Sequence, residues 1–329
     1  MTSLASVRHS SRVVALVFAV GAALTACTIQ EASNRPDSAG VAAAQKSAGR
    51  AWSAETWQAP VVDSTPDDPF ELAVYRGLAI LTHTRDSLPG YVGGNLNCTS
   101  CHLDEGRRPN AAPLVGAFAR YPKYMDRSGA VVPIEDRVNY CFTRSLAGSK
   151  LPSDSREMQD IVAYLAFISQ GVPNGEHVRG EGIAKIQTLI GDSTRGSALF
   201  TDNCARCHGN NGGGMGPIPA LWGPKSFSIG ASMARVERAA SFIRHNMPFD
   251  RPGSLTDQQA YDVARYVTSM SRPDAPGKEN DWPSGVAVPS DVPYDTKGHK
   301  ASHPPKLLPR TTNAAAAIVN APASVLRPK

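Results

Sequence analysis

Two short stretches of the same pattern decide the fold of this chain, CTSCH at residues 98–102 and CARCH at residues 204–208. In the pattern C-x-x-C-H, each cysteine can form a thioether bond to a vinyl group of haem, and the adjacent histidine can reach the iron from the same side. We therefore predict two covalently bound haem c groups. The predicted attachment residues are Cys98, Cys101 and His102 for haem 1, and Cys204, Cys207 and His208 for haem 2.

Two other uses of paired cysteines compete with this interpretation. A zinc site can use C-x-x-C without the histidine, and a thioredoxin-like redox pair is expected within a βαβ unit. No βαβ pattern surrounds either motif, and both copies carry the histidine. The repeated, histidine-containing form favours haem.

The segments around the two motifs also repeat. DIVAYLAFIS at 160–169 aligns with DVARYVTSMS at 262–271, and both have apolar residues at helical spacing. The second of these helices is preceded by a capping-box pattern, Thr256 with Gln259. A further helical stretch precedes each haem motif. The order of helix, haem motif, long haem-wrapping loop and closing helix occurs twice, which predicts an all-α fold of two tandem domains.

The glycine-rich and charged stretch GVPNGEHVRGEG separates the two repeats and predicts the domain boundary. The expected organisation, in chain order, is a signal peptide at 1–27, a flexible tether at 28–60, domain 1 at 61–172, a linker at 173–182, domain 2 at 183–274 and a proline-rich, basic extension at 275–329.

The N-terminus has the features of an export signal. Arg8 and Arg12 precede the apolar run VVALVFAVGAALTA, which is too short to span a bilayer comfortably but suits the core of a signal peptide. The run ends in Leu-Thr-Ala-Cys27, which resembles a bacterial lipobox, in which the cysteine is acylated and becomes the first mature residue. An ordinary signal with a chance cysteine is the alternative. We expect a lipoprotein anchored to a bacterial membrane on its periplasmic side.

The repeat also suggests a second axial ligand for each haem. The methionines that follow His208 are Met215, Met233, Met247 and Met270. Met247 precedes a proline and lies 39 residues after His208, and the same offset from His102 leads to Cys141. We expect Cys141 to ligate haem 1 and Met247 to ligate haem 2. The alternative for Cys141 is a buried free cysteine that packs as a small apolar residue.

The expected ligands predict which of the two haems has the lower reduction potential. A thiolate lowers the potential of its haem and a thioether raises it, so electrons would run from haem 1 to haem 2. Basic residues gather near Cys141, with six basic side chains against three acidic ones between Arg120 and Lys150. Arginines can bind a small oxyanion through paired donors, although a solvated or haem-propionate-binding face would look the same in sequence.

Together with both haem motifs, three further stretches carry a family resemblance: RVNYCFTRSLAG at 137–148, ALWGPKSFSIGASMAR at 220–235 and NMP at 246–248. This combination resembles the diheme thiosulfate dehydrogenases, tetrathionate-forming cytochromes c, over roughly Pro60 to Tyr294. The resemblance implies two class I cytochrome c domains, the ligation described above, and oxidation of two thiosulfates to tetrathionate. It also implies transfer of electrons to an external acceptor such as a small periplasmic cytochrome c.

By motif position, the resemblance matches Arg127, Arg137 and Ser145 to substrate-pocket residues beside Cys141. Some relatives carry lysine directly before the distal methionine and can exchange ligands there, whereas Asn246 in this chain favours a plain methionine ligand. Two other functions stay open. One is a diheme cytochrome that only transfers electrons, and the other is a sulfur-transferring diheme cytochrome of thiosulfate oxidation.

The resemblance implies that the chain beyond Tyr294 is an addition to the family core. Its residues after Asp295 include six lysines and arginines and no acid, so we expect a solvated, disordered tail, with contact to anionic lipid or an acidic partner as the alternative. The overall net charge of +5 includes this tail and the signal. No nucleotide or nucleic-acid motif is present, so nucleic acid is not an expected partner.

Overall fold

The computed structural model describes residues 52–62 and 66–310. The expected signal peptide, Cys27 and most of the expected tether lie outside the described residues, as does the end of the C-terminal extension. Within the described part of the chain, no helix is long and apolar enough to cross a membrane.

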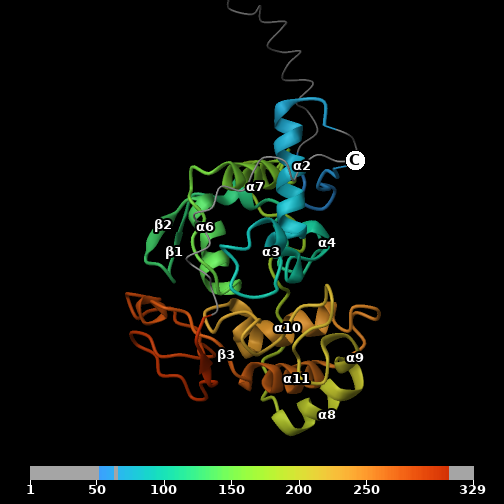
Figure 1. Cartoon of the computed structure of the whole chain (residues 1–329), viewed down its shortest axis with the longest axis vertical. Coiled ribbons are helices and arrows are strands. Elements are labelled where there is room, and N and C mark those ends of the chain that lie inside the picture. Colours follow the sequence, from blue (N-terminus) through green and yellow to red (C-terminus); the bar gives the residue numbers. More distant parts are fainter. Residues whose placement is uncertain (1–51, 63–65, 311–329) are drawn as a thin grey trace, which may run out of the picture. The chain divides into compact units, whose positions relative to one another are not determined.

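Two helices that pack against each other frame the first haem motif, α2 (Pro69–Thr82) and α7 (Arg156–Phe167) (Figure 1). Helix α2 begins after Asp68, whose carboxylate accepts hydrogen bonds from the first backbone N–H groups. Arg76 of α2 forms a bidentate ion pair with Asp160 of α7, with both N–O distances at 2.6 Å. A Cβ on Gly77 would lie 2.1 Å from the Asp160 carbonyl oxygen, so the absence of a side chain lets the helices touch.

The second motif has an equivalent frame, α8 (Ser193–Asn203) packed against α11 (Asp257–Ser269). Arg195 of α8 pairs with Asp262 of α11 at 2.8 and 2.9 Å, and a Cβ on Gly196 would lie 2.0 Å from the Asp262 carbonyl oxygen. The predicted capping box at the start of α11 is confirmed. A third helix, α10 (Val236–Asn246), packs on α11.

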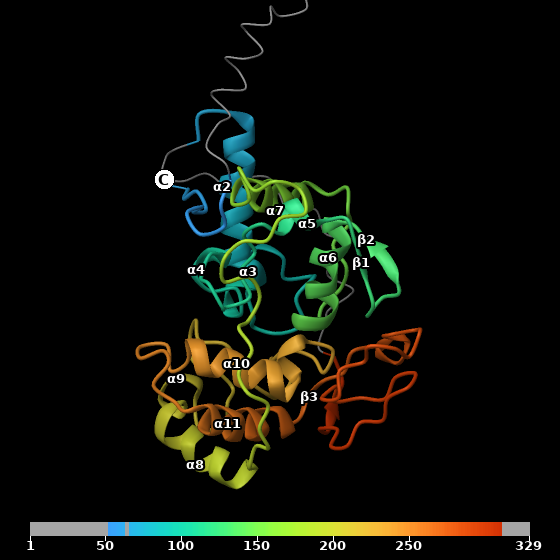
Figure 2. The same cartoon turned by 180° about the vertical axis from the view of Figure 1, so that it is seen from behind.

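The remaining elements are short. They are α3 (Thr84–Ser87), η1 (Cys98–Ser100), α4 (Leu103–Gly106), α5 (Ala117–Arg120), α6 (Ile134–Tyr140), η2 (Cys141–Ser145), α9 (Ala205–His208), η3 (Ser232–Ala234) and η4 (Lys278–Asn280). Strands β1 (Lys123–Met125) and β2 (Ala130–Val132) form an antiparallel hairpin that lies beside α6 in both views (Figures 1 and 2). Strands β3 (Arg272–Pro273) and β4 (Leu307–Leu308) pair in parallel. The described chain is therefore rich in helices, with only two small strand pairs.

The C-terminal extension differs from the expected disordered tail as far as Arg310. Trp282, Val292 and Tyr294, which precede this tail, are buried in an apolar cluster, and within the tail β4 pairs with β3. The guanidinium of Arg310 donates to the carbonyl oxygens of Ala147 at 2.9 Å and of Gly148. The basic composition suggested solvation, but carbonyl groups just beyond the end of a helix accept hydrogen bonds from a cation, and this contact holds the extension on the protein.

Candidate haem-binding and active site

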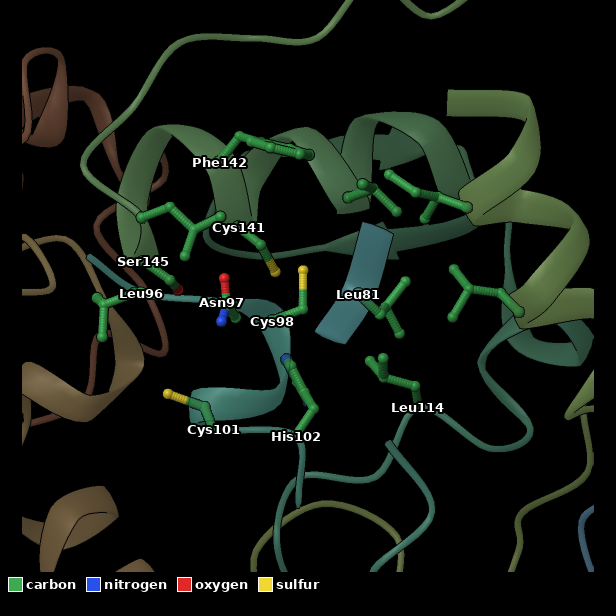
Figure 3. Close-up of a pocket in the computed structure, with 14 residues that line it drawn as sticks. Leu81, Leu96, Asn97, Cys98, Cys101, His102, Leu114, Cys141, Phe142 and Ser145 are labelled. Atoms are coloured by element: carbon green, nitrogen blue, oxygen red, sulfur yellow. The ribbon is translucent and has the colours of Figure 1, made fainter. Parts of the chain in front are cut away.

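A largely apolar pocket contains the first haem motif (Figure 3). Leucine, isoleucine, valine and phenylalanine side chains form most of its wall, and Cys98, Cys101 and His102 lie together on one side. An apolar lining with a few convergent polar groups is typical of a site that binds a cofactor.

The proximal side of this cavity is ordered by hydrogen bonds. Asn97 and Ser100 cap the short helix η1, which carries Cys98. The Nδ1 atom of His102 lies 2.5 Å from the carbonyl oxygen of Ala112 and donates its proton there, so Nε2 is free to bind a metal. Thr84 donates a hydrogen bond to Cys98 Sγ at 3.3 Å.

The second motif has the same arrangement at its histidine. His208 Nδ1 lies 3.0 Å from the carbonyl oxygen of Pro219, so its Nε2 is also free. Cys204 is half-buried and Cys207 is exposed, and the five described cysteines are all free of disulfide bonds. The described residues contain no cluster of three or more His, Cys, Asp or Glu side chains that could hold a metal ion. In each motif, a histidine with a free Nε2 follows two cysteines, an arrangement that fits haem c.

Cys141 faces the first haem motif from the other side of the cavity (Figure 3). It opens η2, a π-helical turn in which the Leu146 N–H donates to the Cys141 carbonyl oxygen at 2.8 Å. Single π-turns of this kind occur frequently at functional sites. The structure thus brings the predicted distal residue into the same cavity as His102.

The charge on Cys141 differs from that on its neighbours. Burial raises the pKa of Cys98 and of Cys101 to about 12, so these two thiols would be neutral. Burial acts in the same direction at Cys141, but the guanidinium of Arg137 and contact with His102 outweigh it and lower the pKa to about 6. Arg137 donates to Cys141 Sγ at 3.0 Å. Arg137 therefore favours the thiolate of Cys141, the form that binds metals and attacks sulfur.

The structure brings two of the predicted substrate residues to Cys141 and directs the third elsewhere. Arg137 contacts the sulfur directly, and Ser145 lines the cavity. Arg127 instead donates two hydrogen bonds to Asp281, at 2.9 and 3.0 Å. Arg144 donates to the other oxygen of this carboxylate at 2.5 Å.

Asp281 and its partner Tyr294 were missed by reasoning from sequence. Asp281 is only 3% exposed and accepts a further hydrogen bond from the Tyr294 hydroxyl at 2.7 Å. Its two arginine partners lie more than 130 positions earlier in the chain, and no local pattern marks it as their counter-ion. The quoted family stretches do not include it either.

The predicted distal methionine of haem 2 follows α10 directly. Met247 packs in a buried apolar cluster with Phe242 and Leu103, and Met233 packs against the same cluster. Met215 is 48% exposed in a glycine-rich loop. Met247 stays the predicted ligand, with Met233 as the methionine nearest to it in this cluster.

Comparisons with known proteins identify the family of both domains. Residues 93–174 match the family described as SoxA/TsdA, cytochrome c domain, and residues 193–271 match the cytochrome c family. A thiosulfate dehydrogenase of Psychrobacter arcticus is 44% identical over 244 residues, which are 72% of this chain and 74% of that protein. The thiosulfate dehydrogenase of Allochromatium vinosum is 40% identical over 226 residues, or 65% of this chain and 83% of that protein.

A solved structure shows the same fold. The as-isolated form of the thiosulfate dehydrogenase TsdBA from Marichromatium purpuratum is 32% identical, with a TM-score of 0.65 over 68% of this chain. This chain spans 51% of that longer one. With two cytochrome c domains, a site that fits haem and relatives matched over most of their length, the chain belongs to the thiosulfate dehydrogenase family of cytochromes c.

Proposed function

We propose that this protein oxidises two thiosulfates to tetrathionate on the Cys141 side of the first haem site. The reaction joins the two outer sulfur atoms and releases two electrons, which leave through the second haem site to an external acceptor such as a small periplasmic cytochrome c. The observation that carries the proposal is the Cys141 thiolate, held 3.0 Å from Arg137 in the cavity that also contains His102. This site unites an anion-binding group with a reactive sulfur.

The cofactors proposed here are two haem c groups bound through Cys98 and Cys101 and through Cys204 and Cys207, with His102 and His208 as proximal ligands. When bound, they supply two one-electron acceptors, which matches the two electrons released. Cys141 and Met247 are the proposed distal ligands. A thiolate ligand lowers the reduction potential of a haem and a thioether raises it, so the first haem should have the lower potential.

The side chains around the cavity favour anions. Arg137 favours the anionic form of the Cys141 sulfur and offers a guanidinium beside it that can donate hydrogen bonds to an oxyanion. Ser145 can donate a hydrogen bond to a sulfonate oxygen, which lowers the cost of burying it. Arg127 and Arg144 share the single carboxylate of Asp281, so this group of three keeps a net positive charge that favours the approach of dianions.

A lipid anchor would hold this enzyme at a membrane on the periplasmic side. The proposal rests on the sequence before and including Cys27, which lies outside the described residues. Mass spectrometry of the mature N-terminal peptide tests it, since acylation adds the mass of the lipid to Cys27. A Cys27→Ala variant should be released from the membrane fraction with unchanged haem content.

An anaerobic titration tests the proposed reaction. Purified ferric holoprotein is mixed with thiosulfate while haem absorbance and tetrathionate are measured. We expect reduction of the haems and one tetrathionate for every two electrons accepted. An unreduced protein would indicate an electron-transfer cytochrome without its own substrate. Reduction or sulfur transfer that needs a carrier-protein cysteine, with no tetrathionate, would indicate the sulfur-transferring alternative.

A further inference from the structure

One short segment, residues 110–112, contacts residues of both haem sites. The carbonyl oxygen of Ala112 accepts the hydrogen bond from His102 Nδ1 at 2.5 Å. Two residues earlier, the carbonyl oxygen of Asn110 accepts a hydrogen bond from Asn246 Nδ2 at 3.1 Å. Asn246 directly precedes Met247. The same piece of backbone therefore meets the proposed proximal ligand of haem 1 and the residue next to the proposed distal ligand of haem 2.

The backbone of this segment is unusual and firmly held. Asn110 and Ala112 both have left-handed conformations, with φ of 62° and 49°. Asparagine tolerates this region, but it is unfavourable for alanine. The N–H groups of Asn110 and Ala112 donate to the carbonyl oxygens of Gly180 at 2.9 Å and Gly182 at 2.7 Å, in the segment predicted to be the linker. Such a conformation persists only where its surroundings fix it, and such places cluster at functional sites.

Asn246 is fixed on its own side as well. It is 2% exposed, and its Nδ2 atom donates to the Phe242 carbonyl oxygen at 3.1 Å as well as to Asn110, so both amide protons have partners. Apolar contacts join the same two segments as these hydrogen bonds. Ala111, which is fully buried, forms one cluster with Leu103 and Phe242, and Met247 packs against it.

From these contacts we propose that residues 110–112 are an inter-haem bridge that positions ligands of both haems together. Through Ala112 the bridge fixes the orientation of the His102 imidazole, and through Asn246 it fixes the loop that carries Met247. Asn246 is a positioning residue, since it touches neither substrate nor iron. The proposal rests on the proposed ligand roles of His102 and Met247. Its consequence is that a change made in one domain alters the ligand geometry in the other.

The first test changes the bridge from the side of domain 2. In holoprotein carrying Asn246→Leu, the branching of the side chain is kept, and its hydrogen bonds to the carbonyl oxygens of Asn110 and Phe242 are lost. We expect hydrogen exchange at the Asn110, Ala112 and Met247 amides to become about two- to tenfold faster, which corresponds to the one hydrogen bond that crosses to Asn110. The electron paramagnetic resonance signal of ferric haem 1 should also shift, although no residue of domain 1 has changed.

A matched control removes a buried hydrogen bond that does not cross between the domains. Thr268 of α11 is 5% exposed and donates only to the Arg265 carbonyl oxygen of its own helix. Thr268→Val should therefore leave the haem 1 signal and the exchange at residues 110–112 unchanged.

The reciprocal test changes the bridge from the side of domain 1. A β-branched residue is strongly disfavoured at positive φ, so Asn110→Val should displace the bridge and shift the absorbance and potential of haem 2. Asn110→Gly keeps the carbonyl oxygen and the left-handed backbone, and should leave haem 2 unchanged. Coupling between two sites is reciprocal, so both directions should be observed.

Two outcomes would overturn the bridge. One is that Asn246→Leu loosens only the Met247 loop, with haem 1 and residues 110–112 unaffected. The other is that Asn110→Val alters haem 1 alone. Neither outcome involves thiosulfate, so failure of the bridge is distinct from failure of the proposed reaction, which the wild-type tetrathionate assay reports separately. If Asn246→Leu does not accumulate as folded protein, the milder Asn246→Ser removes the same long-range contact.

Discussion

The two haem domains share a frame and differ at the distal side. In each, an Arg-Gly pair on the first helix meets an aspartate on the closing helix, Arg76 with Asp160 and Arg195 with Asp262. The glycine next to each arginine allows the helices to touch. In each, the proximal histidine donates to a backbone carbonyl oxygen downstream of it. These shared features therefore cannot explain any difference in chemistry between the two domains.

The distal residues separate the two domains. Cys141 opens a π-helical turn, one helical turn after Arg137, which donates a hydrogen bond to its sulfur and lowers the pKa of its thiol. Met247 follows the end of α10, and the arginine three residues before it, Arg244, pairs with Asp257. A charged, reactive sulfur lies in one domain and a neutral one in the other. This contrast suggests that substrate chemistry belongs to domain 1 and electron exit to domain 2.

Replacing Cys141 is expected to have the largest effect. Cys141→Met would make the two distal ligands alike, exchanging an anionic donor for a neutral one and raising the potential of haem 1. Thiosulfate oxidation should fall by orders of magnitude, whereas a chemical reductant should still reduce the protein. Steady-state tetrathionate formation and a redox titration measure the two effects.

Cys141→Gly makes the same test without a replacement sulfur. Tetrathionate formation at the wild-type rate in both variants would exclude a catalytic Cys141. An unchanged ferric haem 1 spectrum would exclude Cys141 as a ligand too.

The corresponding change in domain 2 should affect electron exit alone. Met247→Ala removes the sulfur donor but none of the four attachment cysteines, so both haems should remain bound. The potential of haem 2 should fall, and turnover with an external acceptor should drop more than reduction of haem 1 by thiosulfate. Rapid-mixing spectra that resolve the two haems provide the measurement. If the haem 2 spectrum and potential are unchanged, Met233 or Met215 becomes the preferred ligand.

Neutralising Arg137 should weaken the active site without removing a ligand. Arg137→Gln removes the charge that lowers the pKa of Cys141 and the donor at 3.0 Å from its sulfur. Hydrogen bonds to charged groups contribute about 1.5 to 3 kcal/mol, so kcat/KM for thiosulfate should fall by about 10- to 150-fold. Arg244→Gln, at the comparable place in domain 2, is the control and should leave thiosulfate kinetics unchanged. If Arg137→Gln kept wild-type thiosulfate kinetics, as the control should, then Arg137 would have only a structural role.

Local sequence patterns predicted much of the molecule. The two C-x-x-C-H motifs and the helical repeats indicated two haem domains, and the shared offset of 39 residues led to Cys141, which the structure places in the His102 cavity. The two cytochrome c domains and the capping box could be predicted because such motifs, caps and helical periodicity are encoded within a few residues. The family resemblance is confirmed by relatives matched over most of the chain.

Long-range pairing could not be predicted in the same way. Counting charges around Cys141 does not tell which arginine is neutralised, and Arg127 is held by Asp281, 154 positions away. Composition alone suggested a solvated tail, whereas Arg310 reaches carbonyl oxygens beyond η2. The contact of Asn246 with Asn110 spans 136 positions. Each of these pairs depends on how the packed elements meet, which no local pattern records.

The smallest expected effect tests whether the two frames are equivalent. Gly77→Ala and Gly196→Ala each place a methyl group about 2 Å from a backbone carbonyl oxygen of the closing helix. The helices must move apart, and such overpacking typically costs about 1 to 3 kcal/mol of unfolding free energy. Denaturant unfolding of the holoprotein, followed at each haem, should show a similar loss in the domain that carries the change. Ser197→Ala, next to Gly196 on α8, adds no atoms and serves as the control. A large loss of stability in one domain with none in the other would mean that the repeated Arg-Gly and Asp contact stabilises only one of the two domains. Contacts with the haems would then be the feature that stabilises both.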